Sequence, residues 1–297
     1  MAVLATVTVS ACAQIAPTVG PALGGGPGLS ITGFSVEPPE VFSGSTSRFI
    51  MDLENSGGAI VTDAASMAVL IGPTGWSLTN QVQHFGKDLR PADPVRQTPA
   101  DTKRLTWSLT APTISRGQIR TDTFDGVIYY DYETTGRGTI WVYSEAEADA
   151  ARASGRTLRT SEFTTNAGPL AVAVTISPDP VVLFGTEDTF TMTLRLSNAG
   201  GGTIYQRGAV TYTETSPGAI VITRDELNKV NVAITAPGLT IAECTGDQEL
   251  IAGRDTTLIC DVTVDTPPTT FVGYTIDVSA IYGYSSLRTV QVKVSGR

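Results

Sequence analysis

Histidine, cysteine and charge are all scarce in this sequence of 297 residues. It holds one histidine and three cysteines, and charged residues make up only 16% of it, against roughly 25% in an average globular protein. A lone histidine excludes metal centres built from several histidines and leaves His84 as the one candidate base for a Ser-His-Asp triad. Neither a G-x-S-x-G nor a G-x-x-x-x-G-K-[ST] motif occurs. We therefore predict no enzyme and no cofactor, with His84 in a solvated loop.

Basic clusters and long apolar runs are missing as well. The net charge is −9, so the long-range field repels a polyphosphate, and we exclude nucleic acid as a partner. No stretch reaches the 18 or so apolar residues of a membrane-spanning helix. No N-x-S/T acceptor for glycosylation is present.

Hydrophobic residues, in contrast, make up 41% of the chain, which is enough for a real core in each half. Thr, Val, Gly, Ser and Pro replace the missing charges, and this composition is typical of many short strands joined by tight turns. The chain length suits about two domains.

An internal repeat indicates the architecture. The segment 36–44 (VEPPEVFSG) resembles 176–185 (ISPDPVVLFG), and each is followed by an amphipathic strand, 49–53 or 190–194. Each of these strands leads into an Asn-x-Gly-Gly turn. Phe, Met and Leu alternate with polar residues in both strands, so one face is predicted to be core and the other solvated.

The later parts of the repeats also correspond. Residues 105–109 parallel 258–262, and Tyr130-Asp131-Tyr132 parallels Tyr282-Gly283-Tyr284. Closing strands are expected at 139–143 and 289–294. We predict an all-β fold with two tandem immunoglobulin-like β-sandwich domains at 30–165 and 166–297, preceded by a hydrophobic segment and Gly/Pro-rich linker at 1–29.

One short helix is expected between the two domains. Ser144-Glu145-Ala146-Glu147 is a capping box, and Gly155 provides a stop, so the helix should cover 145–154. A helix at a domain junction would set the angle between the sandwiches.

These features resemble a known family. The Pro-rich entry, the amphipathic strand and the Asn-x-Gly-Gly turn are similar to CARDB-type Ig-like modules of prokaryotic surface proteins, and VEPPEVFSGS and LENSGG look especially like archaeal ones. The resemblance covers about residues 30–297 and implies adhesion, scaffolding or envelope structure. Its motifs are turn and core signals, so they point to a fold more than to an activity.

Two of the cysteines, Cys244 and Cys260, lie on neighbouring predicted strands. A disulfide between them would imply an oxidising compartment. The alternative is a pair of buried free thiols that pack as small apolar residues.

The N-terminus allows three interpretations. Val9-Ser10-Ala11-Cys12 fits a lipobox, in which Cys12 is lipidated, although no Lys or Arg precedes the apolar run. Alternatively, Val3, Ala5, Val7, Val9 and Ala11 form one face of a strand that is donated to the sheet of a second copy. The third interpretation is a terminus without a role.

Candidate binding residues are few. Asp122 and Asp125 form a weak calcium candidate, because D-x-x-D lacks further ordered oxygen ligands. Trp76 follows a Gly-Pro-Thr-Gly loop, where it is either exposed for binding or buried in the core. The loop 81–102, rich in Asp, Arg and Pro, has no counterpart of like composition in the second repeat and offers a place for recognition.

The leading functional expectation is a non-enzymatic extracellular structural protein: a cell-surface stalk, coat or filament subunit that associates with copies of itself. The alternative is a membrane-anchored lipoprotein or adhesin that binds the cell envelope, a polysaccharide or a protein through the loops of the first domain.

Overall fold

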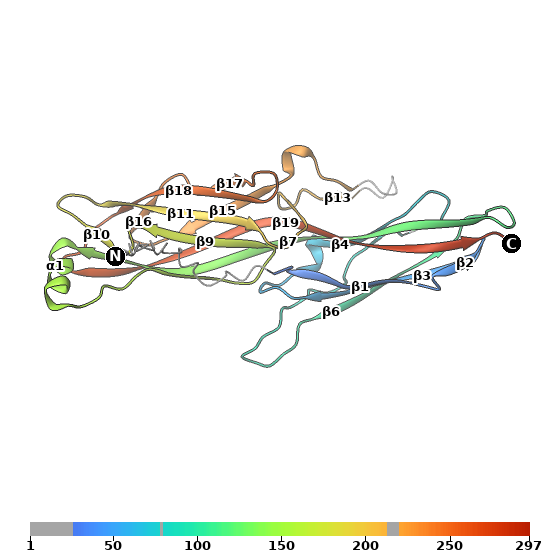
Figure 1. Cartoon of the computed structure of the whole chain (residues 1–297), viewed down its shortest axis with the longest axis horizontal. Helices are drawn as coiled ribbons and strands as arrows, with labels where there is room; N and C mark the ends of the chain where they lie inside the picture. Colours follow the sequence, from blue (N-terminus) through green and yellow to red (C-terminus); the bar gives the residue numbers. More distant parts are fainter. Residues whose placement is uncertain (1–25, 78–79, 213–219) are drawn as a thin grey trace, which may run out of the picture.

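The computed structural model describes residues 26–77, 80–212 and 220–297, and it shows an elongated molecule with two β-rich lobes placed end to end (Figure 1). The predicted all-β sandwich fold with one short helix is confirmed. The candidate donated strand (Val3 to Ala11) and the lipidation candidate Cys12 lie outside the described residues.

One face of the first lobe is a three-stranded sheet in the order β1-β3-β6. Its central strand β3 buries Phe49, Met51 and Leu53, which alternate with polar residues as the sequence predicts. The strands of this sheet are β1 (Leu29–Glu37), β3 (Thr46–Asn55) and β6 (Thr102–Thr110).

The second lobe has an equivalent face in the order β16-β18-β11-β9. Here β11 buries Phe190, Met192 and Leu194, the counterparts of the three β3 residues in the repeat. The strands are β9 (Leu170–Ser177), β11 (Thr189–Asn198), β16 (Leu239–Ile241) and β18 (Asp255–Val264).

Both lobes share their other face, a ten-stranded sheet organised around β7 (Ile119–Ser144) and β19 (Phe271–Ser295). These two strands pair antiparallel without a break over their whole length, from Ile119 opposite Ser295 to Tyr143 opposite Phe271. The remaining strands of this sheet are β2 (Glu40–Phe42), β4 (Ser66–Ile71), β5 (Val82–Gln83), β8 (Glu162–Thr165), β10 (Val181–Leu183), β12 (Thr203–Tyr205), β15 (Lys229–Thr235) and β17 (Gly246–Glu249). A separate hairpin pairs β13 (Thr211–Tyr212) with β14 (Ile220–Val221), and short 3₁₀ turns cover Asp63–Ala65 and Arg224–Glu226.

The great length of β7 corrects the expectation that Tyr130–Tyr132 and residues 139–143 form two strands. Even-numbered residues of β7 face inward in both lobes, from Phe124 to Val142, so the two-residue period never slips. Strand β19 buries its even-numbered residues from Ile276 to Tyr284 and again at Val292 and Val294, with less buried residues between them. Neither Tyr-Asp-Tyr nor Tyr-Gly-Tyr contains a favoured two-residue hairpin turn. Both strands, β7 and β19, therefore continue through these residues into the other lobe.

As a result, the two repeats exchange their last strands. In an immunoglobulin-like sandwich the last two strands lie side by side in one sheet. Here the first repeat's β2 pairs in parallel with the end of β19, at Lys293–Ser295, whereas the second repeat's β10 pairs in parallel with the end of β7, at Val142–Ser144. Each sandwich is therefore completed by the other repeat.

The helix α1 forms where it was expected, over Glu145–Ser154, but it occupies a different place in the molecule. The Ser144 side chain accepts from the Glu147 amide, and Gly155 ends the helix in the left-handed conformation. Because β7 continues through the second lobe, α1 lies at the far tip of that lobe rather than at a junction (Figure 1). The expectation that it sets an angle between the sandwiches is wrong for that reason.

The predicted division at 165/166 stays a prediction, and strand pairing crosses it in both directions. Strand β19 from the second segment pairs with β7 from the first over 25 residues, and the buried hydrophobic residues of both lobes form one connected cluster.

Candidate functional site

The most unusual feature of the molecule is a cluster of buried tyrosines at its waist, where β7 and β19 pass from one lobe to the other. Tyr130 and Tyr132 of β7 lie directly opposite Tyr284 and Tyr282 of β19. All four rings point inward and are nearly inaccessible to solvent. Their centroids are 5.7 Å apart for Tyr130 and Tyr284, and 6.1 Å apart for Tyr132 and Tyr282, within the range of favourable aromatic pairs.

Two of these tyrosines fix the starts of the first strand of each repeat. The Tyr130 hydroxyl accepts from the Leu29 amide at 3.1 Å and donates to the Pro27 carbonyl at 2.8 Å. The Tyr282 hydroxyl accepts from the Leu170 amide at 3.0 Å. Leu29 opens β1 and Leu170 opens β9, so the same hydrogen bond occurs once in each repeat.

The other two tyrosines bind the Asn-x-Gly-Gly turns. The Tyr132 hydroxyl accepts from the amides of Gly58 at 2.8 Å and Ala59 at 3.1 Å, and it donates to the Ala167 carbonyl at 2.7 Å. The Tyr284 hydroxyl accepts from the Gly202 amide.

The glycines of these turns are required by the closeness of the tyrosines. A Cβ on Gly57 would lie 2.2 Å from the Tyr132 hydroxyl oxygen, and one on Gly200 would lie 2.3 Å from that of Tyr284. Sequence analysis treated the turns only as turns and missed this contact. The signal was present, since the Gly-Gly pair and the Tyr-x-Tyr pair recur together in both repeats.

A fifth tyrosine covers the opposite face of the waist. The Tyr205 ring fills the space above Gly283, where a Cβ would lie 1.9 Å from a ring atom. Its hydroxyl donates to the Tyr284 carbonyl at 3.2 Å. Asp131, the residue opposite Gly283, accepts from the Gly208 amide at 3.3 Å and pairs with Arg207 at 3.4 Å.

Burial determines the electrostatics of this cluster. Removal from water raises the pKa of Tyr130, Tyr132, Tyr205, Tyr282 and Tyr284, because the charged phenolate loses its hydration. Burial also raises the pKa of Asp131, while the Gly208 amide and Arg207 act against it. Tyrosines that stay protonated and bonded to the backbone are poor nucleophiles. The cluster is therefore suited to holding the lobes together rather than to catalysis.

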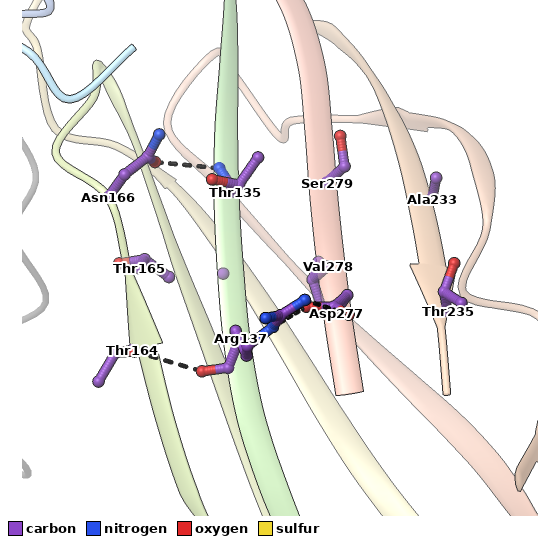
Figure 2. A pocket seen from close by; sticks show the side chains of 11 residues that line it. Thr135, Arg137, Thr164, Thr165, Asn166, Ala233, Thr235, Asp277, Val278 and Ser279 are labelled. Atoms are coloured by element: carbon purple, nitrogen blue, oxygen red, sulfur yellow. Dashed lines mark hydrogen bonds and ion pairs between the residues drawn. The ribbon is translucent and has the colours of Figure 1, made fainter. Parts of the chain in front are cut away.

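A shallow pocket of about 630 Å³ lies on the solvated face of the same ribbon, within the second lobe (Figure 2). The Arg137 guanidinium spans it and binds Asp277 through two hydrogen bonds, of 2.6 and 3.0 Å. This contact lowers the pKa of Asp277. Asn166 accepts from the Thr135 amide at 3.0 Å on one side, and Ser279 donates to Glu133 at 2.6 Å on the other. These polar groups thus have protein partners already.

Trp76 is not exposed, which corrects its candidacy as a binding residue. Its side chain is 5% accessible and packs edge-on against Phe49 and Phe124, while its indole N–H donates to Asp122 at 2.8 Å. The alternative interpretation, a core tryptophan, is the one the structure supports. The loop before it turns inward because Gly72 and Gly75 allow the chain to approach Phe124 and Pro112 closely.

Asp122 and Asp125 do not form a calcium site. They lie three residues apart on β7, so their side chains project from opposite faces of the sheet. Asp122 is buried and bound by Trp76 and Arg120, and Asp125 accepts from Thr289 at 2.7 Å. Within residues 26–77, 80–212 and 220–297, no group of three or more His, Cys, Asp or Glu side chains is arranged to hold a metal ion.

The remaining candidates are placed as follows. Cys244 and Cys260 are joined in a disulfide, with Cα atoms 5.7 Å apart. His84 is exposed in its loop, with Nδ1 3.0 Å from the Ser66 carbonyl oxygen. Among the described helices, none has the length and apolar character needed to cross a membrane.

The loop 81–102 projects from the first lobe as a small hairpin. Asp93 and Thr98 bond to each other through both backbone groups, at 3.0 and 3.1 Å, and Val95 at the tip is 91% exposed. A pocket of about 730 Å³ lies along this hairpin, lined by residues that include Lys87, Arg90 and Arg96.

Comparison with known proteins gives little further information. No protein-family model matches the chain, and no curated protein matches it. Among solved structures, it is similar to Escherichia coli alpha-2-macroglobulin activated by porcine elastase, with 12% identity, a TM-score of 0.23, and coverage of 90% of this chain and 32% of that one. The chain thus spans about a third of the length of that protein. So slight a likeness carries no argument, and the functional conclusion depends on the residues themselves.

Proposed function

We propose that this chain is a non-enzymatic structural protein of the cell exterior, a rigid spacer within a stalk, coat or filament. The observation that carries this proposal is the continuous ribbon of β7 and β19. At about 3.3 Å per residue, a strand of 26 residues extends roughly 85 Å. A ribbon of this length, paired throughout, couples the two lobes far more firmly than a single linker would.

The exchange of strands adds to this rigidity. To separate the lobes, the ladder between β7 and β19 must break at the waist, and the tyrosine hydrogen bonds must break with it. Two independent sandwiches on a linker would separate without the loss of any such contact. The geometry therefore suits a protein that keeps a fixed length under load.

The disulfide supports the exported location. Disulfides persist in oxidising compartments and are rare in the reducing cytosol. Cys244 and Cys260 are both fully buried, and their bond ties the segment after β16 to β18.

Two measurements test the proposal. Immunogold labelling and protease treatment of intact cells that produce the protein should place it on the outside; labelling only after lysis would refute the location. Force spectroscopy on the purified chain, pulled from its two ends, should give one unfolding event that releases both lobes. Two separate events, each of about half the contour length, would refute the coupled spacer.

A second candidate function is recognition through the projecting hairpin at 90–101. The observation that favours it is the apolar side chain of Val95 at an exposed tip flanked by Arg90 and Arg96. Replacing residues 92–99 by a Gly-Ser turn should abolish binding to cells or polysaccharide in a pull-down assay, with Thr186→Ser on the other lobe as a control. Unchanged binding would exclude this loop as the recognition site.

A further inference from the structure

The two far ends of the molecule each carry an exposed aromatic side chain close to the corresponding short strand of the repeat, β2 or β10. Phe42 ends β2 and is 46% exposed, whereas Phe184 follows β10 and is 51% exposed. Figure 1 places β2 near one end of the long axis and β10 near the other. Single exposed apolar side chains occur elsewhere on this surface too, so the tips are of interest because a cluster of such residues can mark a contact site.

A second exposed apolar residue accompanies each phenylalanine. Ile119 starts β7 and Phe271 starts β19, and they are 66% and 44% exposed. At one end, β2 and β7 flank β19 on its two sides, with Phe42 and Ile119 both opposite Ser295. At the other end, β10 and β19 flank β7 in the same way. Each end is thus a small apolar patch built by the same part of the repeat.

The two patches differ in charge. Beside Phe42, the Arg297 guanidinium lies over the ring at 3.9 Å, and Arg116 is exposed in the loop that Gly117 ties to Gly296. Neither arginine is in an ion pair within the part of the chain that the structure describes. Nearby Lys293 and Glu40 neutralise each other at 3.1 Å. The two unpaired charged side chains at this end are therefore both basic.

The opposite end is acidic. Glu187 bonds through its amide to the Phe184 carbonyl, and Glu145 begins α1 directly after β7. Both carboxylates are exposed, and neither has an ion-pair partner among the described residues. Arg152 and Arg156 are neutralised by ion pairs with Asp149 and Glu147, whereas Arg159 lies over the Trp141 ring and keeps its charge, so the unpaired carboxylates of Glu145 and Glu187 outnumber it.

From these observations we infer that the basic end of one copy docks on the acidic end of the next. Unlike ends attract, with Arg116 and Arg297 facing Glu145 and Glu187, and Phe42 packs in the apolar patch around Phe184 and Phe271. Like ends repel, so a closed two-fold dimer is disfavoured. A heterologous contact of this kind repeats along the long axis and gives an open chain of molecules. The inference specifies the assembly left open in the proposed structural role, and it requires no contribution from residues 1–25.

Disulfide trapping tests the direction of docking. Gln118 and Thr186 are exposed beside the two patches and belong to neither charge set. In a Cys12→Ser background, Gln118→Cys and Thr186→Cys chains should form a mixed disulfide when combined and oxidised, and the chain that carries both changes should give a ladder of multimers. Each single variant alone should form no disulfide-linked dimer. Dimers of equal yield in the single variants, or no mixed product, would overturn the inference.

Charge exchange tests the chemistry. Arg116→Glu with Arg297→Glu should weaken self-association about tenfold or more in sedimentation velocity, and so should Glu145→Lys with Glu187→Lys. A chain with all four changes should associate again, because its ends have exchanged sign. Val95→Asp on the side of the first lobe is the matched control and should change nothing. If the unaltered chain does not associate at high concentration and low salt, or if its association is insensitive to these changes, end-to-end docking is refuted. The spacer role is tested independently, by labelling of cells and by force spectroscopy.

Discussion

Tyr132 and Tyr282 face each other across the ladder of β7 and β19, with ring centroids 6.1 Å apart, and both hydroxyls bind backbone at the start of the second repeat, at Ala167 and Leu170. Tyr132 bonds to the turn at Gly58 in the first lobe and to Ala167 just before β9 of the second. Tyr282 shares a 2.9 Å hydrogen bond with Thr134 of β7. One pair of side chains thus joins both repeats at the point where their strands are exchanged.

Removing one hydroxyl from this cluster should destabilise the whole molecule. Tyr132→Phe leaves the Ala59 amide without its partner, although the Gly58 amide keeps the Ala167 carbonyl as an acceptor, and Tyr282→Phe leaves the Leu170 amide without its partner. A buried donor without a partner costs about 1–3 kcal/mol. Urea unfolding, followed by circular dichroism, should show that loss in one cooperative transition. Tyr129→Phe, which removes no hydrogen bond recorded among the described residues, is the control and should stay within about 0.5 kcal/mol.

The same cluster predicts a loss of stability in alkali. The pKa of each waist tyrosine in the folded protein is raised above its ordinary value of 10.0 by burial. Above pH 10 the unfolded chain therefore releases protons that the folded chain retains, so the free energy of unfolding falls as pH rises. The stabilisation is complete below pH 10 and is lost above it. Melting temperatures measured between pH 8 and 11 should fall beyond pH 10, and tyrosinate absorbance should appear as the protein unfolds. Ionisation of all nine tyrosines near pH 10 without unfolding would contradict the burial of the cluster.

Sequence analysis could predict the strands, the turns and the helix, because each has a local signal. The alternation of Phe49, Met51 and Leu53 and the capping box at Ser144 are examples. The partner of a strand is a different matter. A closing strand that returns beside its own repeat and one that continues into the other repeat have the same two-residue period. The evidence for continuation was the lack of a turn sequence at Tyr130–Tyr132. The burial of Trp76 could not be predicted for a different reason: nothing in the sequence of its loop indicates that the indole turns back towards Asp122.

Strand exchange makes the first lobe depend on residues of the second repeat. Val292 of β19 is completely buried, and the end of that strand pairs with β2 of the first repeat. Val292→Ala should cost roughly 2 kcal/mol through the cavity that it leaves. The change should alter the fluorescence of Trp76 and Trp107, which lie in the first lobe although the substitution lies beyond residue 165. Gln291→Ala, one position away and exposed, is the control. Unchanged tryptophan emission in a destabilised Val292→Ala chain would mean that the lobes fold independently.

The disulfide should contribute to the stability of the second lobe. It closes a loop of 16 residues, which in the chain-entropy model corresponds to about 3 kcal/mol. A Cys244→Ala, Cys260→Ala double variant should therefore melt at a lower temperature than the oxidised chain. The oxidised chain treated with a reductant should move towards the variant, whereas the variant itself should not respond. Equal melting temperatures in all three samples would show that packing alone holds Cys244 against β18.

Asp122 should act as a structural anchor and not as a calcium ligand. Its carboxylate binds the Trp76 indole at 2.8 Å and the Arg120 guanidinium, and it is 4% exposed. Asp122→Ala leaves the buried indole N–H without an acceptor, at a cost of about 1–3 kcal/mol. Asp125→Ala removes only an exposed bond to Thr289 and should cost less than about 0.5 kcal/mol. Because the two carboxylates project from opposite faces of β7, neither calcium nor a chelator should shift the melting temperature of the unaltered chain. A stabilisation by calcium that disappears in both variants would restore the metal site; unequal variants with no calcium response would establish Asp122 as part of the core.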